Sequence, residues 1–257
     1  MTRDWNPALY LKFADERTRA ARDLLAQVPL DAPRAVYDLG CGPGNSTELL
    51  VARYPDAVVT GVDNSPAMLE KAAKACPGAS FEEADLARWT PDGAPDLLYS
   101  NATFQWVPDH VSVLARLAGT LADGGALAVQ MPDNLDEPSH ALMRDTAANG
   151  PWAEKLANAA GARDLLPTPS VYYDRLKPHF TRLDIWHTAY NHPLDGHAGI
   201  VNWLSSTGLR PFLNPLTEAE RDAFIAAYTE RLAQAYPLSC DGTVLLRFPR
   251  LFIVGQR

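Results

Sequence analysis

Several residue patterns that would point to other kinds of protein are scarce in this sequence. The 257 residues include three cysteines and no C-x-x-C pair, so neither a disulfide framework nor a zinc site is indicated. Lysine and arginine total 23 against 31 acidic residues, a net charge of −8, and no basic run occurs. Such a chain lacks the basic surface that releases counterions from nucleic acid or an anionic membrane. These absences argue against a metal site and against a nucleic-acid or membrane partner.

Long apolar segments are absent as well. No run approaches the length of a transmembrane helix, and the N-terminus has charged Arg3 and Asp4 and no apolar core of signal-peptide length. We therefore expect a cytoplasmic protein. A composition of 47% hydrophobic and 21% charged residues is typical of a soluble globular protein. The length allows one large domain, or a domain that carries an insertion.

The most informative segment is the stretch AVYDLGCGPGNS from Ala35 to Ser46. A short apolar run leads into Gly40, Gly42 and Gly44 and then into a helix-like segment. Glycines permit positive φ and the approach of a ligand to bare backbone, and a helix start offers free N–H groups. The third glycine comes one residue earlier than in the dinucleotide fingerprint. Asp38 before the first glycine would repel a pyrophosphate and attract a cationic ligand.

Acidic and polar residues also end the next predicted strands. The run 58–63 ends in Asp63, about 20 residues after the first glycine, where a carboxylate can accept hydrogen bonds from ribose hydroxyls. The runs 81–86 and 96–102 bring Asp85 and Asn101 to corresponding positions. Strand and helix patterns alternate over 35–132, which predicts a parallel sheet with right-handed crossovers. Ligands of such sheets bind at the carboxyl ends of the strands.

The remaining segments have weaker patterns. An N-terminal helix either packs on the sheet or forms a lid in which Trp5, Tyr10 and Phe13 exclude water. Residues 133–180 are punctuated by prolines. Pro249 is expected to place the last strand at a sheet edge or a bulge. The later elements are predicted as short helices at 137–148 and 151–161, a strand at 181–190, helices at 197–206 and 217–236, and a strand at 243–255.

Together, these motifs and their order resemble the class I S-adenosylmethionine-dependent methyltransferases. The resemblance implies a doubly wound, Rossmann-like seven-stranded α/β sheet with a helical cap inserted in the C-terminal half. It also implies S-adenosylmethionine as cofactor and S-adenosylhomocysteine as its product. Asp38 would lie near the methionine end of the cofactor, Asp85 would meet the adenine amino group and Leu86 would pack on the ring. The cofactor-binding residues on this view are Asp38, Gly40, Gly42, Gly44, Asn45, Asp63, Asn64, Met68, Asp85, Leu86 and Asn101.

Blocks outside the glycine loop carry a closer resemblance, to the trans-aconitate 2-methyltransferase family. They are DWNP at 4–7, NA at 101–102, QW at 105–106, TGLRPF at 207–212 and LLRFPRLF at 245–252. The family esterifies one carboxylate of a tricarboxylic acid. A carboxylate is already ionised at neutral pH, so it needs cations to bind it rather than a base. The expected substrate-binding residues are Arg210, Arg247, Arg250, Trp106 and Tyr10, and the expected catalytic residues are Gln105, Trp106 and His192.

We thus expect one methyltransferase domain over 1–257, with a lid at 1–30, a cofactor-binding core at 31–132, and a cap with the last strands at 133–257. We expect a small anionic carboxylate as substrate, no metal and no required protein partner. Other interpretations stay open. The loop is also compatible with a tight β–α turn in another doubly wound protein, and acids at strand ends also serve as helix caps. The acceptor is alternatively an amine, a phenol or a carbon nucleophile, or the protein binds the cofactor without catalysis. An NAD(P) dehydrogenase is disfavoured by the glycine spacing and by Asp38.

Overall fold

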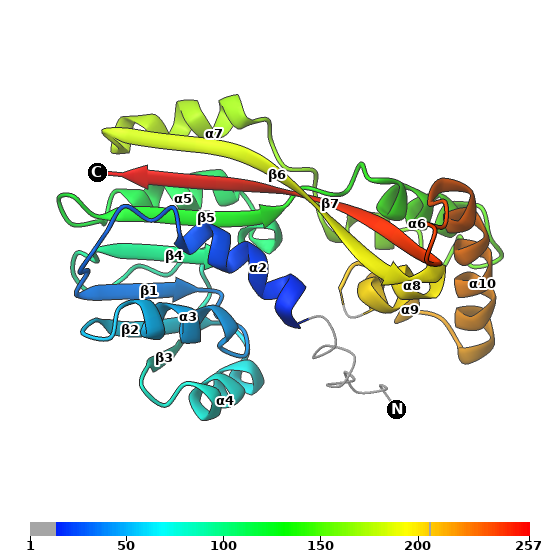
Figure 1. Cartoon of the computed structure of the whole chain (residues 1–257), viewed down its shortest axis with the longest axis horizontal. Helices are drawn as coiled ribbons and strands as arrows, with labels where there is room; N and C mark the ends of the chain where they lie inside the picture. Colours follow the sequence, from blue (N-terminus) through cyan, green and yellow to red (C-terminus); the bar gives the residue numbers. More distant parts are fainter. Residues whose placement is uncertain (1–13, 206) are drawn as a thin grey trace. The chain divides into compact units, whose positions relative to one another are not determined.

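The computed structural model describes residues 14–205 and 207–257 (Figure 1). The predicted lid residues Trp5, Tyr10 and Phe13 lie outside the described residues. The chain divides into two compact units. We call the unit formed by 17–132, 166–188 and 250–257 the sheet unit. The other, whose described part includes 133–165, 189–205 and 207–249, is the helical unit.

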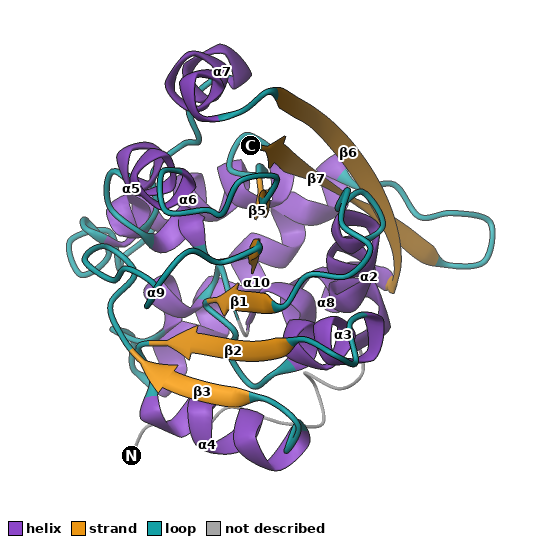
Figure 2. Cartoon of the chain, turned by 90° about the vertical axis from the view of Figure 1, so that its left-hand side faces the viewer, coloured by secondary structure: helices purple, strands orange, loops and turns teal. Residues whose placement is uncertain are grey.

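A seven-stranded sheet with the order β3-β2-β1-β4-β5-β7-β6 organises the fold. Neighbouring strands from β3 to β5 pair in parallel, whereas β7 runs antiparallel to β5. Figure 2 shows β1, β2 and β3 side by side and pointing the same way. This topology confirms the predicted doubly wound α/β sheet. The strands are β1 (Ala35–Leu39), β2 (Val58–Asp63), β3 (Ser80–Glu83), β4 (Leu97–Asn101), β5 (Ala126–Pro132), β6 (Arg182–Asp195) and β7 (Thr243–Gln256).

The placement expected for the last strand is wrong. β7 is continuous through Pro249 and lies between β5 and β6 rather than at an edge. The proline is tolerated because it stands just beyond the β5–β7 ladder, whose last partners are Pro132 and Arg250. The N–H of Asp133 donates to the Pro249 carbonyl at 3.0 Å. Proline has no N–H, so the reverse hydrogen bond from residue 249 to Asp133 is not formed.

The helices follow the predicted pattern in part. Those predicted at 137–148, 197–206 and 217–236 are confirmed as α6, α8 and α10, and Thr217 and Glu220 form a capping box at the start of α10. α7 was not predicted. The helical elements are α2 (Ala14–Leu25), α3 (Asn45–Arg53), α4 (Pro66–Ala75), η1 (Phe104–Trp106), α5 (His110–Ala118), α6 (Pro138–Ala148), η2 (Ala159–Ala162), α7 (Pro169–Leu176), η3 (Lys177–His179), α8 (Gly196–Ser205), α9 (Arg210–Leu213) and α10 (Glu218–Ala235).

The helix predicted at 151–161 is wrong. This segment consists of turns that end in the 3₁₀ helix η2. Contacts of the Trp152 side chain determine the conformation of this segment. The indole is buried, its Nε1 donates to the Thr146 carbonyl at 2.8 Å, and its ring packs edge-on against Phe224. A short segment with such an anchor gains more from burying one aromatic ring than from local helical hydrogen bonds.

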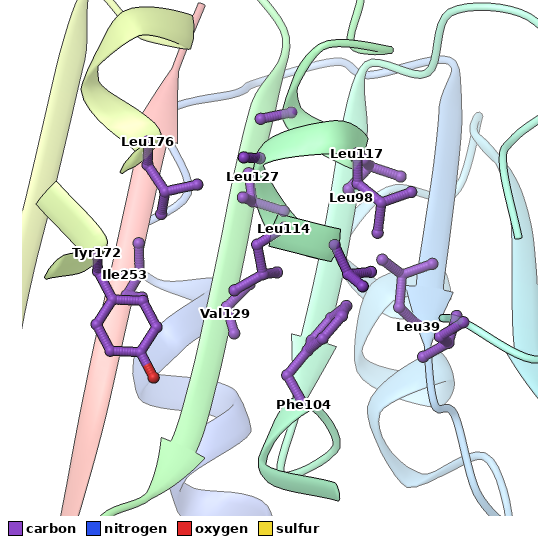
Figure 3. Packing of buried hydrophobic residues seen from close by; sticks show 14 of the residues in the cluster. Leu39, Leu98, Phe104, Leu114, Leu117, Leu127, Val129, Tyr172, Leu176 and Ile253 are labelled. Carbon is purple, nitrogen blue, oxygen red and sulfur yellow. The ribbon is translucent and has the colours of Figure 1, made fainter. Parts of the chain in front are cut away.

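Helices cover both faces of the sheet in the sheet unit. Figure 3 shows one face, where Leu98 of β4 and Val129 of β5 meet Leu114 of α5 and Tyr172 of α7 in a continuous apolar cluster. On the other face, the Tyr99 hydroxyl donates to the Ala21 carbonyl of α2 at 2.6 Å. The described part of the N-terminal helix therefore packs on the sheet. Because both faces are buried, only the ends of the strands are available for binding.

The helical unit has a core of its own. Trp203 and Leu204 of α8 pack with Phe224 and Tyr228 of α10 in one apolar cluster. The Tyr228 hydroxyl donates to the carbonyl of Ser139 in α6 at 2.7 Å and thereby ties α6 to α10. Each unit is therefore held together by a separate set of apolar side chains.

Candidate functional site

The glycine loop connects the carboxyl end of β1 to the start of α3. Gly40, Gly42 and Gly44 have φ values of 74°, 54° and 99°, a conformation that favours glycine. A Cβ atom at Gly40 would lie 2.1 Å from the Thr103 side chain, and one at Gly44 would lie 3.2 Å from Cα of Ala72. At Gly42 it would meet nothing within 4 Å. Gly40 and Gly44 are therefore in close contact with neighbouring parts of the chain, whereas the backbone of Gly42 is open to a ligand.

Asp38 is a fully buried carboxylate beneath this loop. Its Oδ2 accepts hydrogen bonds from Ser46 Oγ at 2.8 Å and Thr47 Oγ1 at 2.7 Å, both at the start of α3. Its Oδ1 is buried and has no hydrogen-bond partner in the described part of the chain. Desolvation raises the pKa of Asp38 from 3.8 to about 6, although the two hydroxyls oppose the shift. A buried acceptor with an open lone pair suits a cationic donor such as an ammonium group.

Asp63 at the end of β2 joins two loops. Its Oδ2 accepts from the Gly42 N–H and its Oδ1 from the Ser65 N–H, each at 2.9 Å. The side chain remains half-buried, and each carboxylate oxygen can accept a further bond. Asp63 therefore fixes the open glycine and keeps capacity for hydroxyl donors. Its role as a ribose ligand stays a prediction.

A change at Asp63 tests that prediction. Asp63→Ala should weaken S-adenosylmethionine binding by about 10- to 100-fold, because it removes charged acceptors and also releases Gly42. Asp63→Asn keeps one acceptor oxygen and should lose less. Calorimetric titration with S-adenosylhomocysteine measures both changes. A cofactor affinity equal to that of the wild type in Asp63→Ala would remove this residue from the site.

The tip of β4 presents further polar atoms. Asn101 Oδ1 and Gln105 Oε1 are buried and find no hydrogen-bond partner among the described residues, while Gln105 Nε2 donates to the Ala102 carbonyl at 2.6 Å. Thr103 Oγ1 donates to the Gly40 carbonyl at 3.1 Å and ties this tip to the glycine loop. Trp106 in η1 is 50% exposed. β1 and β4 are neighbours, so Asp38 and Asn101 belong to adjacent strand ends.

The other predicted cofactor residues occupy varied environments. Asn45 begins α3 and is half-buried, Asn64 is exposed, and Met68 is half-buried in α4. Asp85 is exposed, and its Oδ1 accepts from the Ala87 N–H at 3.0 Å, so it forms a local turn. Leu86 is buried in the apolar cluster of the sheet unit. Contacts of these residues with adenine stay predictions.

The predicted substrate residues are divided between the two units. In the helical unit, Arg210 is exposed at the start of α9, and the exposed Arg247 forms an ion pair with Glu137. His192 is 3% exposed, with its ring stacked on Trp203 at 4.5 Å. This placement gives the ring a packing role, and its role as a base stays a prediction. Arg250 belongs to the sheet unit and is 4% exposed.

Gln130 of β5 was not predicted as a site residue. It is fully buried, and its Oε1 accepts from Arg250 Nη1 at 3.1 Å. The signal in the sequence was a lone glutamine in the otherwise apolar run ALAVQMP. Ser46 and Thr47 were also missed, because a hydroxyl next to a glycine loop is too common to single out. Thr103 was missed because it is 63 residues from Gly40 in the chain and meets the loop only in the folded protein.

These side chains fit the implied cofactor. The buried Oδ1 of Asp38 offers an acceptor for the ammonium of an amino acid, and Gly42 offers open backbone beside it. Among residues 14–205 and 207–257, no group of three or more His, Cys, Asp or Glu could hold a metal ion. No helix in this described part of the chain is long and apolar enough to cross a membrane.

Comparisons with known proteins agree with this geometry. Residues 36–125 match a family described as a methyltransferase domain. The YcgJ protein of Bacillus subtilis superposes with a TM-score of 0.61 at 14% identity, covering 93% of this chain and 98% of that one, a likeness of fold. The family match over 36–125 and the strand order define the class of protein, because the chain contains a methyltransferase domain on a doubly wound sheet.

Relatives of known sequence narrow the class. A trans-aconitate 2-methyltransferase of Rhodopseudomonas palustris (strain BisB18) is 60% identical over 252 residues, which are 98% of each chain. One from Agrobacterium fabrum (strain C58) is 56% identical over 253 residues, covering 98% of this chain and 99% of that one. The chain belongs to the trans-aconitate 2-methyltransferase family.

Proposed function

We propose that the protein transfers the methyl group of S-adenosylmethionine to a carboxylate of trans-aconitate, or of a closely related small polycarboxylate, and forms a methyl ester. The observation that carries this proposal is the identity of 56–61% with trans-aconitate 2-methyltransferases over nearly the whole chain. That identity includes the segments outside the glycine loop, which differ most between methyltransferases of different substrates.

The residues around the glycine loop would hold the cofactor. Asp38 Oδ1 would accept from its ammonium, the backbone of Gly42 would lie against it, and Asp63 would accept from its ribose hydroxyls. When bound, the cofactor supplies an electrophilic methyl group on a sulfonium. Gly42 and Asp63 are already joined by a hydrogen bond, so this part of the site is preorganised.

The acceptor needs anchoring more than it needs a base. A carboxylate is ionised at neutral pH, and two further carboxylates of a tricarboxylic acid remain to be bound by cations. Among the predicted arginines, Arg250 is the best candidate, because it is buried and hydrogen-bonded to Gln130 at the carboxyl end of β5. Arg210, Arg247, Trp106 and Tyr10 remain proposed substrate ligands. Gln105 and His192 remain proposed catalytic residues.

We further propose that the protein works in the cytoplasm on this small acid. Its three cysteines are free, and Cys41 and Cys76 are buried as thiols. Free cysteines are common where the surroundings are reducing. Both the methyl donor and the acid are small metabolites, so the reaction requires no macromolecular partner.

Label transfer from methyl-labelled S-adenosylmethionine tests the proposed function. The acids to compare are trans-aconitate, cis-aconitate, citrate, isocitrate and one monocarboxylate. We expect rapid labelling of trans-aconitate and a product that releases its label in mild base, because esters hydrolyse and ethers and methylamines do not. Label that resists base would favour an amine, phenol or carbon acceptor. Cofactor binding without labelling of any acid would favour a non-catalytic binding protein.

A further inference from the structure

Gln130 is an unusual residue in an otherwise apolar, fully buried strand. β5 reads ALAVQMP, and each of its residues is buried. The side chain of Gln130 is 0% exposed, yet its Nε2 has no hydrogen-bond partner among residues 14–205 and 207–257. A buried N–H group without an acceptor is costly, and such groups are rare in folded proteins unless a ligand or water completes them.

The orientation of the Gln130 amide is fixed by its neighbour. Arg250 Nη1 lies 3.1 Å from Gln130 Oε1. A guanidinium only donates hydrogen bonds, so the atom that faces it has to be the amide oxygen. The Nε2 atom is therefore directed away from Arg250 and is left to donate to another group.

The strand register places Gln130 at the carboxyl end of the sheet. Its Cα partner on β4 is Asn101, and Pro132 of the same strand is the partner of Arg250 on β7. Partners in register project from the same face of a sheet, as do residues two apart in one strand. Asn101, Gln130 and Arg250 therefore share one face. Tyr99 also lies on this face, together with its partner Asp38 on β1.

Hydrogen-bond acceptors and donors occupy different parts of this face. Over β1 and β4, the unpartnered buried atoms are Asp38 Oδ1 and Asn101 Oδ1, which are both acceptors. Over β5, the unpartnered atom is Gln130 Nε2, a donor, and the Arg250 guanidinium is its neighbour. Acceptors suit a cation, whereas an amide N–H beside a guanidinium suits an anion with planar oxygens.

We propose that Gln130 is a binding residue of the active site that donates from Nε2 to a carboxylate and, through Oε1, positions Arg250 for the same carboxylate. This inference rests on the proposed function for the identity of the acid. The carboxylate belongs either to the acceptor acid or to the amino-acid end of the methyl donor. Both sources have the same chemistry, and binding measurements separate them.

Two substitutions of Gln130 test the proposal in the full-length protein. Gln130→Met keeps the length of the side chain and removes both hydrogen-bonding atoms. Gln130→Glu keeps an acceptor for Arg250 and places a negative charge where Nε2 was. Val129→Ala is the matched control, because this neighbour in β5 is fully buried on the opposite face of the sheet. The measurements are kcat and KM for trans-aconitate, the Kd of S-adenosylhomocysteine by calorimetry, and thermal stability.

We expect Gln130→Met to raise KM for trans-aconitate about tenfold, with kcat and the S-adenosylhomocysteine Kd within about threefold of the wild type. Gln130→Glu should raise KM about 30-fold, although its bond to Arg250 keeps it at least as stable as Gln130→Met. A variant that is at least as stable but has a higher KM shows that the loss comes from substrate binding and not from poorer packing. A tenfold rise in the S-adenosylhomocysteine Kd instead would assign the carboxylate to the methyl donor and would also support the proposal.

The proposal is overturned if neither KM nor Kd changes by more than about twofold, or if Val129→Ala produces the same changes. Wild-type turnover of trans-aconitate tests the proposed function separately. If the wild type methylates a different acid, that acid replaces trans-aconitate in the comparison of variants. If it methylates none, the Kd of trans-aconitate by calorimetry replaces KM, and the proposal is overturned if neither this Kd nor that of S-adenosylhomocysteine is changed by the Gln130 substitutions.

Discussion

Replacement of Asp38 by asparagine is expected to weaken S-adenosylmethionine binding by more than 100-fold and to stabilise the unliganded protein at neutral pH. The carboxylate is fully buried, and its Oδ1 has no hydrogen-bond partner in the part of the chain that the structure describes. Removal of one member of a buried, hydrogen-bonded charge pair typically costs about 2–5 kcal/mol of binding free energy. Asparagine keeps an acceptor for Ser46 or Thr47 but loses the charge that attracts an ammonium group.

The effect on stability has the opposite sign because burial opposes ionisation. The pKa of Asp38 is raised from 3.8 to about 6, so the folded protein holds this proton more tightly than the unfolded chain does. The unliganded protein should therefore lose stability as the pH rises from about 4 to about 6, and the loss is complete above that range. The pKa difference corresponds to about 3 kcal/mol. Allowing for a weaker bond to one hydroxyl, Asp38→Asn should gain about 1–2 kcal/mol at pH 7.

Calorimetry and thermal unfolding check both effects. The wild-type affinity for S-adenosylhomocysteine should fall about fivefold between pH 6 and pH 5, because the ligand requires the ionised carboxylate, whose pKa is about 6. Asp38→Asn should show weak binding without this pH dependence. If Asp38→Asn binds the cofactor as tightly as the wild type, the carboxylate has only a structural role.

Gly40→Ala is expected to destabilise the protein by about 2–5 kcal/mol and to abolish cofactor binding. Gly40 has a φ of 74°, which costs an alanine about 1–2 kcal/mol. A Cβ atom there would also lie 2.1 Å from the Thr103 side chain, so one of the two strand ends has to shift. Overpacking of this kind adds about 1–3 kcal/mol. The shift would separate the glycine loop from the tip of β4, which the Thr103 hydroxyl now joins.

Gly42→Ala is the matched control for the clash at Gly40. Its φ of 54° is also unfavourable for alanine, but no atom lies within 4 Å of the added Cβ. It should therefore lose only about 1–2 kcal/mol of stability, while cofactor affinity falls because the open backbone is covered. Chemical denaturation and calorimetry measure the two quantities. Equal losses of stability in the two variants would contradict the inference that close contact with Thr103 requires a glycine at position 40.

The strand ends were predictable because their signals are local. The run before Gly40 and the acid at Asp63 each depend on a few neighbouring residues, and alternation of strand and helix then dictates a parallel sheet. The prediction of a helix at 151–161 was wrong because it used local signals alone. The conformation of this segment depends on Trp152, which bonds to Thr146 and packs on Phe224 of a distant helix. A local pattern contains no information about such contacts.

The sequence by itself determined the class of fold, the cofactor loop and the family, because steric rules for glycine and the order of strands and helices operate over short segments. Only the tertiary structure decided which groups each residue contacts or hydrogen-bonds. The Thr103 side chain leaves no room for a Cβ atom at position 40, and both Asp63 oxygens are engaged by backbone N–H groups. Gln130 and Arg250 are 120 residues apart in the chain. Their hydrogen bond exists because the antiparallel register of β5 and β7 brings these two residues together, and that register is a property of the assembled sheet.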